Sequence, residues 1–348
     1  MGRKIAIVLF NLGGPDSQAT VQPFLQNLFA DPAILRVPTP VRYLLARLIS
    51  RLRAPSVKEN YALMKQPGGG SPLLPETEAQ AEALEGTLSI RRPGEIFKVF
   101  IAMRYWHPLT KDTAEAVSAW EPDETVLLPL YPQFSSTTTG SSFGEWKRWY
   151  SGPSKSVCCY PFNDDFILSH ATKIMGAWEK AGKPSNVRIL MSAHGLPEKV
   201  VEDGDPYQWQ VEAMADRLVA HLPDQFETQV CYQSRVGPLK WIGPATEEEI
   251  ERAAKDGKNI MIAPIAFVSE HIETLVELDY EYREIAEELG VHTYITVPAL
   301  STQDLFIKCM ADEVEQTLNS NSTLRSCQGS RLCPKEYGDC PFTEYEAG

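Results

Sequence analysis

Long apolar runs, an excess of basic residues and a nucleotide-binding glycine motif are all missing from this sequence of 348 residues. No apolar stretch reaches the roughly 18 to 20 residues that a membrane-spanning helix needs. The formal net charge is −13 at pH 7, which disfavours nucleic acid as a partner because a polyanion would be repelled. NLGGP at 11–15 lacks the G-x-G-x-x-G spacing, and GGGSP at 68–72 lacks the lysine and hydroxyl residue of a P-loop.

The cysteine content and the N-terminus indicate the compartment. Seven cysteines are an odd number, which disfavours a secreted disulfide framework. The first residues, MGRKIAIVLFNLGGP, pass directly into a strand pattern without the features of a secretory signal. We therefore expect a cytoplasmic protein, either a monomer or a homodimer.

One local segment departs from the acidic balance. Residues 42–53 alternate arginines with leucines and isoleucine at helical spacing, which predicts an amphipathic helix with a basic face. This pattern fits either an ordinary surface helix or a lip that makes peripheral contact with an anionic membrane or steers an anionic ligand.

Eight short, apolar, β-prone segments alternate with helical patterns. This alternation predicts parallel sheets that are covered by helices on both faces. We expect an α/β fold of two Rossmann-like domains, each a four-stranded parallel sheet flanked by helices, with an active-site cleft between them. The segments are 4–12, 97–104, 125–131, 156–162, 187–192, 227–232, 260–267 and 293–297.

The turn-rich stretch SGPSKS at 151–156 marks the expected domain boundary. We expect residues 1–155 to form the first domain and residues 156–302 the second. The helical pattern at 303–318 is expected to pack back on the first domain. Residues 319–348 form a cysteine-containing tail that begins with a polar linker at 319–326.

A histidine stands where a buried strand is expected to end. The apolar run VRILM at 187–191 is followed by SAHGLP, so that Gly195 and Pro197 stop the strand just beyond His194. Ligands of open α/β sheets bind beyond the carboxyl ends of strands. His194 is therefore either a ligand-facing group or a histidine satisfied within a turn.

A second polar cluster follows the apolar run 260–268. It contains Glu270, His271 and Glu273, and Glu277 lies one helical turn further on. Carboxylate and imidazole ligands suit a divalent first-row metal such as iron(II). We predict metal contacts for these four residues and for His194. The later acids Glu281, Glu284 and Glu288 are interpreted as a solvated helix face.

Several motifs together resemble the ferrochelatase family. SAHGLPEKVVEDGDPY at 192–207 looks like the ferrochelatase signature, and FVSEHIETLVELDYEY at 267–282 is similar to its second active-site segment. Further matches follow in the family's order. They are NLGGP at 11–15, GGGSPL at 68–73, MRYWHP at 103–108, LYPQFSSTTTGSS at 130–142 and CYQSRVGPLKWIGP at 231–244. The chain is identified as a bacterial-type member with a C-terminal cysteine extension.

The resemblance implies a lyase that inserts ferrous iron into protoporphyrin IX and releases two protons, the last step of haem biosynthesis. Bending the porphyrin exposes a nitrogen lone pair, and binding contacts remote from the metal can hold it bent. We expect His194 and Glu273 to be catalytic and to lie on opposite faces of the ring. His194 is favoured as the proton acceptor, although neutral imidazole is equally a metal ligand.

Other residues are expected to bind the porphyrin. Tyr131, Phe134 and Trp241 follow strands or lie in loops, where aromatic rings can stack on the macrocycle or pack into the core. The resemblance assigns Arg53, Tyr61 and Ser71 to a propionate-binding group, in which the spacing from Tyr61 to Ser71 is long for the family. It assigns Arg104 and Tyr131 to the inner cleft.

Three cysteines, Cys327, Cys333 and Cys340, lie in a loop-like C-terminal segment. Thiolates bind zinc or iron–sulfur clusters, and four are needed for either kind of site. The resemblance implies a [2Fe-2S] cluster on these three and one distant cysteine, whose position in some relatives is Ser136 here. Cys158 is the expected substitute and Cys159 the alternative. Cys231 and Cys309 lie in apolar runs and are predicted to be packing residues.

Two other functions fit some of these features. A relative that uses coproporphyrin or another metal would keep the same histidine and acids. A haem- or metal-binding carrier would bind without metallating free porphyrin, but it needs no proton acceptor beside a path for metal.

Overall fold

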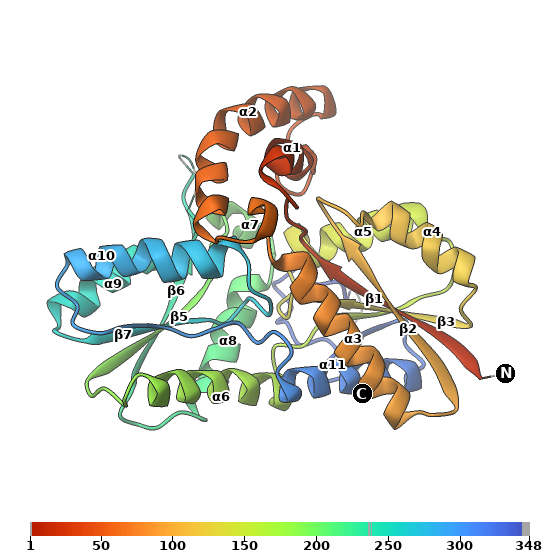
Figure 1. The fold of residues 1–348 in the computed structure, drawn as a ribbon. Coiled ribbons are helices and arrows are strands. Elements are labelled where there is room, and N and C mark those ends of the chain that lie inside the picture. Colours follow the sequence, from red (N-terminus) through yellow and green to blue (C-terminus); the bar gives the residue numbers. More distant parts are fainter. Residues whose placement is uncertain (1, 236, 238, 343–348) are drawn as a thin grey trace. The chain divides into compact units, whose positions relative to one another are not determined.

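The computed structural model describes residues 2–235, 237 and 239–342 of the chain. It contains two compact units, each built on one sheet (Figure 1). The first unit comprises the chain as far as Leu130, together with Ser136–Cys158 and Val314–Leu324. The second comprises Tyr131–Ser135, Cys159–Glu313 and the chain from Arg325 onward. The domain boundaries expected from the sequence stay predictions, and residues 343–348 of the expected tail lie outside the described residues.

The first sheet has the strand order β2-β1-β3-β4-β9, and its pairs β1/β2, β1/β3 and β3/β4 are parallel. The strands are β1 (Arg3–Asn11), β2 (Glu95–Met103), β3 (Glu124–Pro129), β4 (Lys155–Cys159) and β9 (Leu324–Ser326). The short edge strand β9 was not predicted, because its three residues lie in a polar stretch without β periodicity.

The second sheet has the order β6-β5-β7-β8, and all of its pairs are parallel. The strands are β5 (Val187–His194), β6 (Glu227–Gln233), β7 (Asn259–Pro264) and β8 (Tyr294–Thr296). Because β5 is paired with both β6 and β7, the carboxyl ends of these three strands meet at one edge. The predicted α/β class with two parallel sheets is confirmed.

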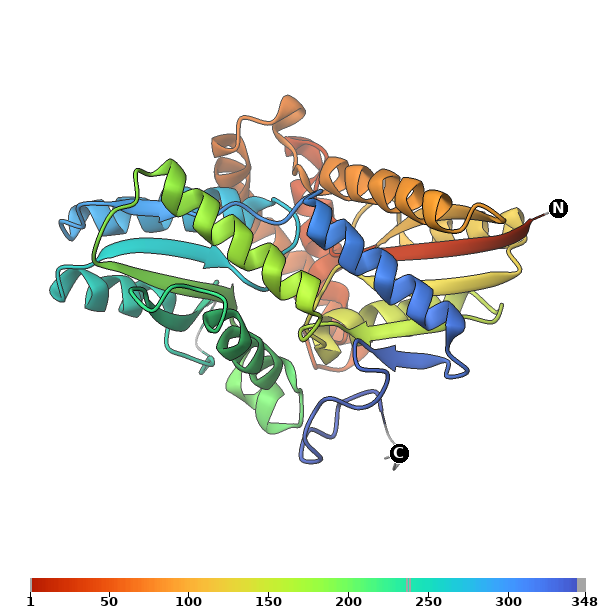
Figure 2. The ribbon, with the colours of Figure 1, turned by 90° about the horizontal axis from the view of Figure 1, so that it is seen from below.

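Helices cover both faces of each sheet. In the first unit α3 lies on one face and α4 and α5 on the other (Figure 1). In the second, α9 and α10 lie on one face and α6 and α8 on the other (Figures 1 and 2). The helices are α1 (Val21–Ala30), α2 (Thr39–Leu63), α3 (Leu73–Arg91), α4 (Thr110–Trp120), α5 (Ser141–Trp149), α6 (Asp164–Lys180), α7 (Glu198–Glu202), α8 (Tyr207–Val219), α9 (Thr246–Lys255), α10 (Tyr282–Glu288) and α11 (Asp304–Asn319). The 3₁₀ turns are η1 (Gln18–Thr20) and η2 (Pro67–Gly69), and the π-helices are η3 (Ser136–Gly140) and η4 (Glu273–Glu281).

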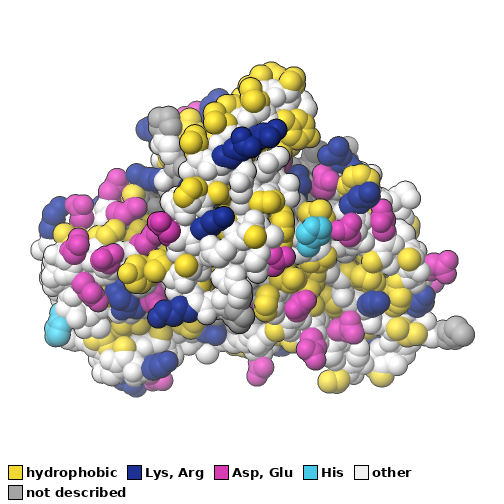
Figure 3. Space-filling model, turned by 45° about the horizontal axis from the view of Figure 1, so that its top comes forward, with side chains coloured by type: hydrophobic (Ala, Val, Ile, Leu, Met, Phe, Trp, Pro, Cys, Tyr) yellow, Lys and Arg dark blue, Asp and Glu magenta, His cyan; other side chains and the backbone are white. Residues whose placement is uncertain are grey.

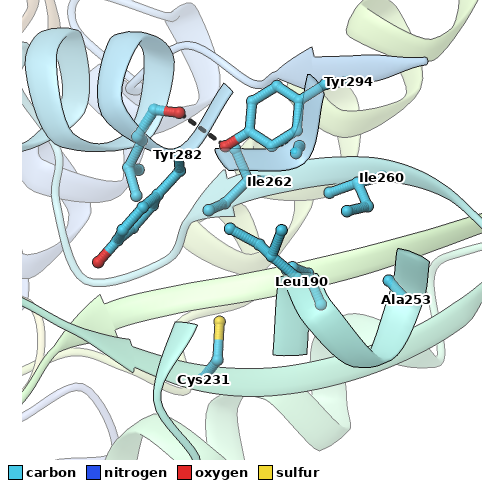
Figure 4. Close-up of a cluster of buried hydrophobic side chains, with 10 residues drawn as sticks. Leu190, Cys231, Ala253, Ile260, Ile262, Tyr282 and Tyr294 are labelled. Atoms are coloured by element: carbon cyan, nitrogen blue, oxygen red, sulfur yellow. Dashed lines mark hydrogen bonds between the residues drawn. The ribbon is translucent and has the colours of Figure 1, made fainter. Parts of the chain in front are cut away.

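The core of the second sheet shows why its strands read as continuous apolar runs. Leu190, Ile260 and Ile262 lie on adjacent strands and are fully buried beneath α9 and α10 (Figure 4). Strands covered on both faces bury every side chain, so they lose the alternation of a half-exposed sheet. Cys231 packs into this cluster and Cys309 is also buried, which confirms both as packing residues.

The sequence of α6 fixes where that helix begins. The side chain of Asn163 accepts hydrogen bonds from the backbone N–H groups of Asp165 and Phe166, and two aspartates occupy the first turn. Both features stabilise the N-terminus of a helix, where N–H groups are unpaired and the helix dipole is positive. One turn further on, His170 is buried against the ring of Phe166.

His170 should make the protein acid-sensitive. Burial lowers its pKa from 6.5 to about 3, so the folded state keeps the ring neutral while the unfolded chain protonates it. The resulting stabilisation is complete above pH 6.5 and is lost as the pH falls towards 3. We expect His170→Gln to remove about 2 kcal/mol of the stability difference between pH 6.5 and pH 5, measured by urea unfolding. An unchanged difference between these pH values would contradict the assignment.

Helix α2 confirms that the predicted amphipathic segment is helical. It spans Thr39–Leu63 and exposes a run of apolar side chains, of which Leu44 is 70% and Leu52 71% exposed. Figure 3 shows such apolar side chains gathered with Lys and Arg over the part of the molecule that carries α2. Among the described residues no helix combines the length and apolarity needed to cross a membrane.

Candidate active site

His194 is the last residue of β5, and a glycine is required directly after it. A Cβ on Gly195 would lie 2.9 Å from the carbonyl oxygen of Gln233 and 3.3 Å from the ring of Trp241, so only glycine permits this approach. The Nδ1 atom of His194 lies 2.6 Å from the carbonyl oxygen of Gly195, which can only accept a hydrogen bond. The neutral ring therefore carries its proton on Nδ1 and a lone pair on Nε2.

Glu273 lies directly beside that lone pair. It is the first residue of π-helix η4, which follows β7 after a short loop. Its Oε1 is 3.7 Å from Nε2 of His194, and its Oε2 is 3.2 Å from Nε2 of His271. Burial raises the pKa of Glu273, but the charges of the two imidazoles and the His271 hydrogen bond outweigh this and lower the pKa overall. Glu273 is thus a half-buried carboxylate held between two histidines.

The expectation that His194 and Glu273 lie on opposite faces of the porphyrin is wrong. A flat ring between them would need a van der Waals contact on each side, about 7 Å in all. The two side chains are 3.7 Å apart, and both extend from the same edge of the second sheet. They therefore face a ligand from the same side.

Glu277 is held by donors at the end of β6. Its Oε1 accepts hydrogen bonds from the Ser234 backbone (2.7 Å) and the Tyr282 hydroxyl (2.9 Å), and its Oε2 accepts one from Gln233 Nε2 (3.1 Å). Burial and the nearby Glu273 raise its pKa. The raised pKa of Glu277 and the lowered pKa of Glu273 distinguish two carboxyl groups that lie four residues apart.

The π-helix η4 places acidic side chains that are four residues apart close to one face. A π-helix has more residues per turn than an α-helix and often marks a functional site. Residues four apart, such as Glu273, Glu277 and Glu281, therefore stay close to one face of η4. The later acids Glu284 and Glu288 are exposed on α10, as expected of a solvated face.

Glu270 and His271 are fixed by the protein itself. Glu270 accepts hydrogen bonds from the Thr274 hydroxyl and from the backbone of Ala299 (2.8 Å). Nδ1 of His271 lies 3.1 Å from the carbonyl oxygen of Ser269, so His271 points Nε2 at Glu273. Within residues 2–235, 237 and 239–342, no group of three or more His, Cys, Asp or Glu side chains is arranged to hold a metal ion.

The three aromatic residues that were predicted to contact the porphyrin lie in different environments. Trp241 forms an antiparallel bridge with Pro197 and packs against Gly195, beside His194. Phe134 is only 4% exposed, which favours its core-packing alternative. Tyr131 belongs to the second unit and is half-buried.

Two predicted propionate-binding residues meet in the first unit. A Cβ on Gly14 would lie 2.5 Å from Ser71 and 3.8 Å from the Tyr61 hydroxyl, so both side chains lie close to the turn at 11–15. The backbone N–H of Ser71 donates to the Pro15 carbonyl over 2.7 Å. The long spacing from Tyr61 to Ser71 therefore does not separate them. Arg53 lies on α2, half-buried and 6.0 Å from the centre of the Phe29 ring.

Arg104 is held by two residues that the sequence did not indicate. Its Nη2 is 2.8 Å from the buried carboxylate of Asp31, and its Nε donates to the Ser141 hydroxyl over 2.7 Å. The Ser141 hydroxyl in turn donates to Asp31 over 2.6 Å. Asp31 and Ser141 lie far from Arg104 in the sequence, so no local motif reveals the contact.

The C-terminal cysteines lie near Cys159. Gln210 Nε2 is 3.1 Å from Sγ of Cys333 and 3.6 Å from Sγ of Cys159, and the backbone N–H of Cys327 donates to the Cys159 carbonyl. A hydrogen bond from Cys333 lowers the pKa of Cys340 to about 6. Cys158 belongs to the first unit, and alternation along β4 turns it away from Cys159.

Fold and site together define a class. The chain is a two-sheet, doubly wound α/β protein with a histidine–carboxylate pair at the strand ends of its second sheet. Among solved structures, the fold is similar to "SirB from Bacillus subtilis with Fe3+" (TM-score 0.51, 12% identity, 90% of this chain and 95% of that one). SirB in complex with cobalt gives the same TM-score at 9% identity, covering 92% of this chain and 97% of that one.

Sequence comparison identifies the family. The model of the family Ferrochelatase matches residues 4–318. A ferrochelatase of Hyphomonas neptunium is 59% identical over 99% of this chain and 96% of its own length, and one of Caulobacter vibrioides is 58% identical over 99% of each. The chain belongs to the ferrochelatase family, which confirms the resemblance found in the motifs.

Proposed function

We propose that this chain is a ferro-lyase that inserts iron(II) into protoporphyrin IX and releases two protons, completing haem synthesis. Membership of the ferrochelatase family supports the reaction, and relatives are 46–59% identical over nearly the whole chain. The observation that supports the assignment of residues is the contact between His194 and Glu273 at the strand ends.

In this proposal His194 accepts protons from the pyrrole nitrogens. Its Nδ1–H bond to the Gly195 carbonyl leaves Nε2 as the only basic nitrogen. The imidazolium that forms is then 3.7 Å from the ionised carboxylate of Glu273, which stabilises it. His271 holds the other oxygen of Glu273 and so keeps the carboxylate aimed at His194.

Iron reaches this pair along η4. Glu273 and Glu277 lie close to one face of the π-helix, and carboxylate oxygens suit ferrous iron as transient ligands. Glu277 is fixed by Gln233, Ser234 and Tyr282, so it can pass a hydrated cation without moving. Trp241 packs beside His194, where its ring can contact the macrocycle. Arg53, Tyr61, Ser71, Arg104 and Tyr131 are proposed as further porphyrin contacts.

The cysteine segment is proposed to bind a [2Fe-2S] cluster through Cys327, Cys333, Cys340 and Cys159, which replaces Cys158 in the expected set. Three thiols of one unit, those of Cys159, Cys333 and Cys340, are joined by Gln210 and by the Cys333–Cys340 hydrogen bond. The backbone N–H of Cys327 donates to the Cys159 carbonyl, so the fourth thiol lies in the same segment. A bound cluster would hold these four thiolates, and Gln210 would donate to two of them.

An anaerobic absorbance assay tests the reaction and the cluster together. The spectrum of the purified protein is recorded before protoporphyrin IX and iron(II) are added. We expect broad visible absorption at the start and then replacement of free-porphyrin bands by haem bands. Porphyrin binding without metallation would instead identify a carrier, and turnover of coproporphyrin alone would change the substrate. Zinc in the purified protein, in place of iron and sulfide, would overturn the proposal of a [2Fe-2S] cluster.

The exposed face of α2 is proposed to contact anionic membrane. Leu44, Leu48 and Leu52 are 70%, 53% and 71% exposed, and arginines alternate with them. We expect the protein to sediment with phosphatidylglycerol vesicles and Leu48→Ser/Leu52→Ser to lose most of that binding. The exposed Ile90→Ser on α3 is the control. Equal binding by both variants would contradict the proposal. Cytoplasmic location and oligomeric state stay predictions.

A further inference from the structure

Gln210 is a buried amide whose donor group faces the cysteine segment. It lies on α8 and is fully buried. Its Nε2 is 3.1 Å from Sγ of Cys333 and 3.6 Å from Sγ of Cys159. Its Oε1 accepts the backbone N–H of Phe134 over 2.8 Å. The last contact fixes the amide, because a flipped side chain would set its NH₂ group against another N–H.

Sulfur is a weak acceptor as a neutral thiol and a strong one as a thiolate. A buried amide that directs its donors at two sulfurs is therefore fully satisfied only when those sulfurs carry negative charge. Such charge arises when a thiophilic metal or an iron–sulfur centre binds, since its cysteine ligands are deprotonated.

The cysteine segment is held in place by its own contacts. The guanidinium of Arg331 donates to four backbone carbonyls, those of Cys333, Pro334, Tyr337 and Phe342, over 2.6 to 2.9 Å. The backbone N–H of Asp339 donates to the Gly204 carbonyl over 3.1 Å. A Cβ on Gly204 would lie 2.8 Å from the Gly338 nitrogen, so the close approach requires glycine. Contacts within the segment and contacts with residue Gly204 therefore both fix the position of Cys333 relative to Gln210.

We propose that Gln210 is a positioning residue of a thiolate site at Cys159 and Cys333, where it stabilises the sulfur charge that develops when a thiophilic metal centre binds. This rests on the cysteine cluster of the proposed function and adds the residue that supports it from outside. Hydrogen-bond partners of metal ligands typically change metal affinity by about 10- to 100-fold.

Cobalt(II) is a suitable probe, because thiolate-to-cobalt absorption reports binding at cysteines and not at the His194 site. The full-length, reduced chain is titrated as wild type, Gln210→Met and Gln210→Glu. Met keeps the size but cannot donate, and Glu keeps the shape but places an acceptor against the sulfurs. The matched control is Gln208→Met, which removes an exposed hydrogen bond to Glu212 on the same helix. Thermal melting checks that each variant is folded. If a Gln210 variant does not fold, Gln210→Asn replaces it, because its shorter amide cannot reach the sulfurs.

We expect Gln210→Met to weaken cobalt binding about 10- to 100-fold and Gln210→Glu to weaken it further, with the control within about twofold of wild type. Wild-type affinity in both Gln210 variants overturns the proposal, and so does a wild type that shows no thiolate absorption. Porphyrin metallation by the same wild-type preparation is measured separately. Its failure would refute the chelatase assignment while leaving the cobalt result intact.

Discussion

His194→Ala should reduce iron insertion by about 10² to 10⁴-fold while porphyrin still binds. The substitution removes the Nε2 lone pair that faces Glu273, and no other imidazole can replace it, because His271 is buried and turned towards the far oxygen of that carboxylate. Initial rates of metallation give the loss. Quenching of porphyrin fluorescence or protein fluorescence should give a dissociation constant within a fewfold of the wild-type value, since one imidazole is a small part of the contact with a macrocycle.

His221→Ala is the matched control, since His221 is exposed and lies outside the site. It should keep wild-type rates. Near-normal turnover of His194→Ala would exclude His194 as the proton acceptor. A parallel loss of binding and rate would instead show that His194 only shapes the binding surface.

The strand-end position of His194 could be predicted because the signal is local. An apolar run followed by Gly195 and Pro197 defines the end of β5 in the sequence itself, and the structure ends β5 at His194. The acidic helix after β7 was equally readable. The π-helix at 273–281 could not be predicted, however, because the number of residues per turn differs by less than one between a π-helix and an α-helix, so the two have similar sequence patterns.

Contacts between distant segments could not be predicted from local pattern. The error about opposite faces arose here: strand order decides that β5 and β7 are neighbours, and only that adjacency brings Glu273 to within 3.7 Å of His194. For the same reason, the contact of Asp31 with Arg104 and the contact of Gln210 with the cysteines could not be predicted. It also left Cys158 and Cys159 undecided, since alternation shows that they diverge but not which one meets the C-terminal segment.

Glu273→Gln should also lower iron insertion by about 10² to 10⁴-fold, because it removes a charge but keeps the shape. The imidazoles lower the pKa of Glu273 below its usual value, so the wild-type carboxylate is ionised throughout the neutral range. The amide cannot stabilise an imidazolium at His194 or bind ferrous iron strongly. Metallation rates at saturating porphyrin measure the loss, and Glu284→Gln, an exposed acid on α10, is the control.

The double variant His194→Ala/Glu273→Gln distinguishes one catalytic unit from two separate roles. If the carboxylate acts by stabilising the proton on His194, its loss matters little once His194 is gone, and the double variant should be no slower than the worse single one. If the two residues performed independent steps on opposite faces of the ring, their losses would multiply. The 3.7 Å contact predicts the first outcome, and multiplied losses would contradict a paired role even if each single variant behaved as expected.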